Sequence, residues 1–104
     1  MGAMLNEDRW SVINFTFNPA SVAANTSAEQ TVSVPGLKVG DYIAGVSKPT
    51  LNAGLGIVNS RVSAADTLAI QFMNNTAAPI DAASEVYSAL VMRPEKVTTG
   101  AFNP

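Results

Sequence analysis

Apolar and polar side chains alternate along several segments of this chain, with the period of two that is typical of β-strands. In the segment 11–18, Ile13, Phe15 and Phe17 share one face, and Val12 lies on the other with polar neighbours. No window of helical period carries convincing caps at both ends. The pattern predicts strands over residues 11–18, 30–34, 41–46, 55–62, 67–74 and 85–92.

Turn residues separate these segments. Pro19 cannot donate to a central ladder and should end the first strand. Pro35-Gly36 is typical of a type II turn, and Gly45 inside a strand suggests a bulge. Residues 23–24 and 82–85 are the two places where a single helical turn is an alternative. We therefore expect an all-β fold, an antiparallel β-sandwich or jelly-roll-like barrel of about seven strands.

The length of 104 residues corresponds to a single β domain over 1–104. Residues 1–10 are predicted to be an N-terminal arm, because the first strand pattern starts after them. Residues 95–104 contain few core candidates and are predicted to be an extended C-terminal tail.

Composition excludes several classes of function. The chain has no cysteine and no histidine, so thiolate and imidazole chemistry, whether nucleophilic, basic or metal-binding, is absent. A net charge of −2 gives no electrostatic basis for nucleic-acid binding. Apolar runs are too short to span a bilayer. We expect neither a nucleic-acid nor a membrane partner.

The remaining polar side chains are better explained by structure than by catalysis. Asp41, Asp66 and Asp81 each lie beside a predicted turn, where aspartate is favoured because it accepts bonds from nearby backbone donors. No serine lies in a nucleophile-elbow motif. The sequence therefore predicts no enzyme, with no catalytic, cofactor-binding or metal-binding residue and no cofactor.

Low charge is the most informative feature, because charged residues make up only 13% of the chain, about half the usual share. Several strands carry apolar residues on both faces: Val58 and Val62 alternate with Leu55 and Ile57. A two-faced apolar strand favours subunit contact, in a dimer or trimer of this chain. The alternative is a curled barrel that is rich in alanine and threonine outside. The candidate interface residues are Trp10, Val58, Arg61, Val62 and Met73.

Two of these candidates have competing interpretations. Trp10 either caps one end of the core or anchors a subunit contact, where tryptophan is favoured. Arg61 either lies on a solvated outer face or belongs to a buried or interfacial ion pair, with Asp66 or Glu85 as partner.

The succession of turn and strand patterns over roughly residues 20–93 resembles small β-rich virion structural proteins of tailed bacteriophages. The segments that carry the resemblance are 32–41, 48–49, 53–58, 61–72, 74–78 and 85–87. They are structural patterns and not catalytic signatures, so no functional residue is carried over from the family.

The resemblance implies a capsid cement or decoration protein, which stabilises the phage head by bridging capsid subunits. Its partners would be copies of itself and the major capsid protein or other virion proteins. Its location would be the virion, after synthesis in the bacterial host cytoplasm. The alternative is a module of a phage tail, fibre or head–tail connection protein that binds a receptor or glycan, for which Tyr42 and Tyr87 are the available aromatic residues.

Overall fold

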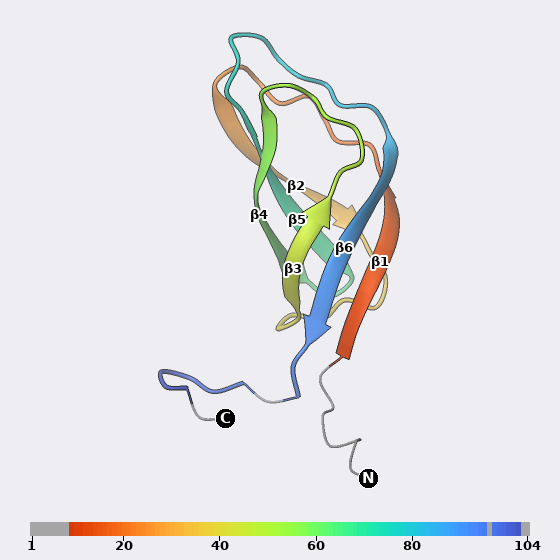
Figure 1. Ribbon diagram of the computed structural model, residues 1–104, viewed down its shortest axis with the longest axis vertical. Coiled ribbons are helices and arrows are strands. Elements are labelled where there is room, and N and C mark those ends of the chain that lie inside the picture. Colours follow the sequence, from red (N-terminus) through yellow and green to blue (C-terminus); the bar gives the residue numbers. More distant parts are fainter. Residues whose placement is uncertain (1–8, 96, 103–104) are drawn as a thin grey trace.

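The computed structural model describes residues 9–95 and 97–102, and this part of the chain forms six strands and no helix. The strands make two antiparallel sheets of three, in the orders β1-β6-β3 and β2-β5-β4 (Figure 1). Within the described ranges, no helical segment has the length and apolar character needed to cross a membrane. The strand bounds are β1 Arg9–Phe17, β2 Thr26–Ser33, β3 Tyr42–Ser47, β4 Leu55–Ala64, β5 Thr67–Asn74 and β6 Glu85–Arg93.

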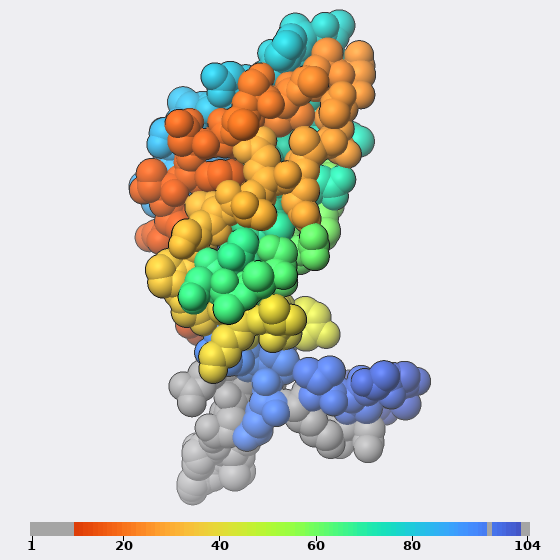
Figure 2. All heavy atoms as spheres, turned by 180° about the vertical axis from the view of Figure 1, so that it is seen from behind, coloured from red at the N-terminus to blue at the C-terminus, as the bar shows by residue number. Residues whose placement is uncertain are grey.

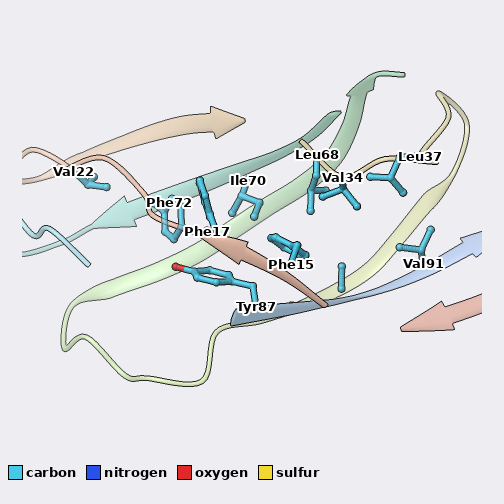
Figure 3. Packing of buried hydrophobic residues seen from close by; sticks show 11 residues of the cluster. Phe15, Phe17, Val22, Val34, Leu37, Leu68, Ile70, Phe72, Tyr87 and Val91 are labelled. Atoms are coloured by element: carbon cyan, nitrogen blue, oxygen red, sulfur yellow. The ribbon is translucent and has the colours of Figure 1, made fainter. Parts of the chain in front are cut away.

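The two sheets pack face to face around one hydrophobic core, and β5 and β6 are their central strands. Only the β4–β5 connection is a hairpin within one sheet, because every other connection passes from one sheet to the other. An aromatic cluster joins the layers: the ring of Phe17 lies 5.4 Å from that of Tyr87 and 6.2 Å from that of Phe72 (Figure 3). Inward residues of both sheets therefore fill the space between them, as their period-two pattern predicts.

The expectation of an all-β antiparallel fold is confirmed, and the sheets do not close into a barrel. About seven strands were expected, and six are found in the described part of the chain. Residues 21–24 contribute only a single bridge, between Val22 and Ile80. Neither alternative helical turn, at 23–24 or 82–85, is formed.

The turn after β2 follows its sequence signals. Gly36 has a φ of 99°, and Leu37 N donates to Val34 O over 3.4 Å, as in a type II turn. The carboxylate of Asp66, in the β4–β5 turn, accepts a hydrogen bond of 2.7 Å from Gly36 N. Asp66 thus fixes two turns to each other, which agrees with the structural role predicted for it.

Strand β4 departs from simple alternation. Its pairing with β5 shifts register between Ile57 and Asn59, and again between Val62 and Ala64. The first bulge inserts Val58, so that Val62 faces inward and packs against the core. The prediction that Val58 and Val62 share an outer face is therefore wrong for Val62, because a bulge reverses the alternation.

The chain ends differ from the predicted division. Strand β1 begins at Arg9, so Trp10 belongs to the sheet and not to an arm, while the predicted arm residues 1–8 lie outside the described residues. In the predicted tail, residues 97–102 form no strand.

Candidate functional site

The outer face of the β1-β6-β3 sheet is apolar, and Figure 1 looks onto it. The strand register places Trp10, Met92 and Tyr42 side by side in one row across the three strands. Val12, Leu90 and Gly45 form the next row. We call this surface the apolar face and define it by Trp10, Val12, Tyr42, Gly45, Val86, Leu90 and Met92.

Side chains of the apolar face are unusually exposed for their type. The exposed fractions are 59% for Trp10, 68% for Val12 and 57% for Tyr42. From these fractions and those of Val86 and Leu90, the five residues together expose roughly 500 Å², near the upper end of the largest apolar patch on a typical monomer. The face therefore has the size and character of a contact surface.

Among the described residues, none of the outward positions on β1, β6 and β3 carries a charged side chain, from the row of Trp10 and Met92 onward. In the row after Val12 and Leu90, Ser88 Oγ donates to Asn14 Oδ1 over 2.7 Å, so the two polar side chains are hydrogen-bonded to each other. A shallow hollow opens where Gly45 leaves the middle of the face without a side chain. Its lining residues are Val12, Gly45, Val46, Ser47, Ser88 and Leu90.

The outer face of the β2-β5-β4 sheet is polar by contrast, and Figure 2 views the molecule from this side. Arg61 donates to Glu29 through Nε and Nη2, with both distances 2.9 Å, and the pair crosses the sheet above buried Ala69. The hydrogen bond from Arg61 lowers the pKa of Glu29. The partner of Arg61 is thus Glu29, and neither Asp66 nor Glu85 as predicted. Arg61 is an outer-face residue, as the first interpretation predicts, and the second interpretation is wrong because the ion pair is exposed and its partner is Glu29.

The five predicted interface residues do not gather on one surface. Trp10 lies on the apolar face, whereas Arg61 and Met73 lie on the opposite polar face. Val58 is 52% exposed at the β4 bulge, and Val62 is directed inward.

Sequence reasoning missed the neighbours of Trp10 on the apolar face. Val12 was assigned correctly to the outer side of β1, but Tyr42 and Leu90 come from strands whose pairing the sequence does not reveal. Tyr87, the other aromatic residue considered for glycan binding, is fully buried and cannot contact a ligand at the surface.

An ion pair closes one end of the two-sheet core. Arg93 donates to both carboxylate oxygens of Asp41 at 2.7 Å, and its Nη2 also donates to Gly36 O at 2.9 Å. The hydrogen bond from Arg93 is the main cause that lowers the pKa of Asp41, whose side chain is nearly buried. Lys38 N adds a further bond to this carboxylate. The pair holds the β2–β3 connection in place, and its charges are already mutually satisfied.

A second ion pair lies where β6 begins. Lys48 Nζ lies 2.9 Å from Glu85 Oε2 and donates to Asn52 Oδ1 over 2.6 Å. The contact with Lys48 lowers the pKa of Glu85. Two residues further along β6, the hydroxyl of Tyr87 is buried without a hydrogen-bond partner among the described residues. Burial, followed by the negative charge of Glu85, raises the pKa of Tyr87 to about 12.

Neither ion pair resembles an active site. The Asp41 carboxylate is bound by Arg93 and the Lys38 backbone, and the Glu85 carboxylate by Lys48 and Thr50. Over residues 9–95 and 97–102, no group of three or more acidic residues could hold a metal ion. The apolar face is therefore the strongest candidate for a functional surface.

Comparison with known proteins gives no relative: no family model, no curated protein and no solved structure matches this chain.

Proposed function

We propose that this chain is a non-enzymatic structural protein of a phage virion, a cement or decoration protein that helps bridge capsid subunits and so stabilises the head. Its two packed sheets would then be a β-sandwich of jelly-roll-like type. The turn and strand pattern over residues 20–93 supports the phage assignment. The apolar face carries the functional part of the proposal, because it is an exposed, uncharged surface on an otherwise ordinary small domain.

The mechanism is adhesion through buried area. Covering about 500 Å² of apolar surface is worth about 12 kcal/mol at about 25 cal/mol/Å². Association costs roughly 4–15 kcal/mol, so one such contact by itself is marginal. Repetition over many copies in a particle makes the sum large, and this is what a protein that resists internal pressure requires.

The direct test is binding to capsids of the tailed phage whose genome encodes this chain, prepared without it. We expect the purified wild-type chain to cosediment with these capsids, and Trp10→Ala to bind more weakly while remaining folded. Met73→Ala is the matched control, since Met73 is also exposed and apolar but lies on the opposite face. Failure of the wild-type chain to bind would contradict the proposed function.

One observation favours a second candidate, a glycan-binding module of a tail or fibre. Trp10 and Tyr42 are both exposed and flank Met92 in one row, so two aromatic rings lie on one flat surface. A glycan array is the test. Binding that is lost in both Trp10→Ala and Tyr42→Ala would support this candidate, and an array without any signal would remove it.

A further inference from the structure

We propose that the neighbour on the apolar face is a second copy of this chain, in a two-fold dimer that packs the outer faces of two β1-β6-β3 sheets against each other. The inference rests on the proposed function in taking this face as a subunit contact, and it deepens that function by naming the partner. Loss of the dimer is then the reason why Trp10→Ala weakens capsid binding, because a dimer can engage two capsid subunits at once.

The charge distribution favours a like partner. A partner of opposite charge would be recognised by charged groups, and the apolar face has none at its described outward positions. The chain as a whole has a net charge of −2, so two copies repel weakly through most orientations. When the two uncharged faces pack together, they bring no like-charged side chains close to each other. The repulsion between the copies is therefore weakest in this orientation.

The relief of the face is self-complementary. Successive rows lie about 6.8 Å apart along the strands, because outward residues alternate. The row of Trp10, Met92 and Tyr42 carries large side chains, and the adjacent row contains the hollow at Gly45. The first row thus forms a ridge, whereas in the second row Val12 and Leu90 are also exposed and the hollow lies at Gly45.

A two-fold axis that lies in the interface, perpendicular to the strands and between these rows, places the first row of each copy over the second row of the other. It brings Tyr42 of one copy over Gly45 of the other, and Trp10 over Val12. Each copy gives and receives the same contacts, as an isologous interface requires. The hollow at Gly45 then accommodates the aromatic ring of Tyr42 from the other copy.

The available area matches a dimer of ordinary size. Apolar side chains alone offer about 500 Å², and the polar residues at the edge of the same face raise this toward the roughly 800 Å² per partner of a standard interface. Both copies would present the outer face of a sheet, and stacked sheets pack about 10 Å apart. A dimer also gives a bridging protein two copies of every other surface, so that it can hold two capsid subunits at once.

Two glycines provide a matched test. A Cβ added at Gly45 or at Gly56 meets no atom within 4 Å, and neither glycine has a φ in the left-handed region. Gly45 lies in the proposed interface, whereas Gly56 pairs with Met73 in the other sheet. Gly45→Glu and Gly56→Glu therefore add the same charge to opposite faces without a clash inside the monomer.

Sedimentation equilibrium over a range of concentrations measures the effect. We expect a reversible dimer for the wild-type chain and for Gly56→Glu, with dissociation constants within about twofold of each other. Gly45→Glu should raise the dissociation constant by about 100-fold or more, because it buries an unpaired charge. Val12→Glu is a second variant at a fully surface position, in case the first perturbs β3.

Fluorescence supplies a local readout, since Trp10 is the only tryptophan. Its emission should shift to shorter wavelength as the concentration passes through the dissociation constant. The shift should be absent in Gly45→Glu and present in Gly56→Glu.

Three results would overturn the inference: a wild-type monomer at every concentration, a trimer, or a dimer that Gly45→Glu and Val12→Glu leave as tight as before. These outcomes are distinguishable from failure of the proposed function. A dimer that binds no capsid contradicts the phage role alone, and a monomer that binds capsids contradicts the dimer alone.

Discussion

The surroundings of Tyr87 predict how its replacement by phenylalanine changes the unfolding free energy, and how that change depends on pH. The ring is fully buried between Phe15 and Phe17, yet its hydroxyl has no hydrogen-bond partner among the described residues. A buried hydroxyl without a partner costs about 1–3 kcal/mol. Tyr87→Phe removes that cost and keeps the ring contacts. We expect the variant to be as stable as the wild-type chain at pH 7, or more stable by about 1 kcal/mol.

The pH dependence gives an independent measure of the same burial. Tyrosine in the unfolded chain ionises near pH 10, whereas the folded pKa of Tyr87 is about 12. Between these values the unfolded state loses a proton that the folded state retains, so stability is fully present below pH 10 and falls as the pH rises. One pH unit corresponds to about 1.4 kcal/mol, so the wild-type chain should lose about 2–3 kcal/mol over this window.

Urea unfolding of both proteins, at several pH values from 7 to 12, tests the prediction. The difference in unfolding free energy between Tyr87→Phe and the wild-type chain should grow with pH, because all other titrating groups are common to both. Tyr42→Phe is the control, since it removes a hydroxyl that is exposed. A difference that stays constant above pH 9 would refute the argument. So would a variant that is less stable at pH 7 by more than about 1 kcal/mol, because the hydroxyl would then have a partner.

Three further predictions concern the connections. Asn74→Ala should lower the unfolding free energy by about 2–4 kcal/mol in urea titrations, because this fully buried amide donates to Val22 O and accepts from Thr76 N. Gly54→Ala should cost more than about 1 kcal/mol by the same measurement, since Gly54 has a φ of 83° and an added Cβ would overlap the Thr76 side chain. Acid titration followed by circular dichroism should show the stability of the fold falling as the pH drops below 3.8. In that range Asp41 takes up a proton in the unfolded chain but stays ionised beside Arg93 in the folded chain. Asp41→Asn should lack this part of the pH dependence.

Local features of the fold could be predicted from the sequence to the extent that they depend on nearby residues. Strand β5 has the predicted bounds, because Leu68, Ile70 and Phe72 alternate without interruption and Asp66 marks the turn before them. The bulge at Gly45 was also expected, and the register shift beside it confirms the expectation. These features need only a few consecutive side chains to specify them.

Features that depend on strand pairing could not be predicted in the same way. The inward position of Val62 results from an inserted residue, Val58, which no period-two count can detect. Arg61 pairs with Glu29 because β2 and β4 both pair with β5 in one sheet. The residues next to Arg61 in the sequence give no information about this strand order. The same reason explains why Trp10 was predicted as a candidate contact residue without Tyr42, which lies two strands away from it.

The position of β6 has a consequence for biosynthesis. It is the last of the six strands along the chain and also the centre of its sheet, so β1 and β3 have no partner before it leaves the ribosome. Trp10 and Met92, neighbours in the sheet, are separated by 82 positions (92 minus 10) in the chain. Long-range pairing of this kind is slow to form. The β4–β5 hairpin can fold early, whereas the surface proposed to join two copies forms only after β6 has left the ribosome, so chains that have not yet exposed β6 have no such surface through which to associate.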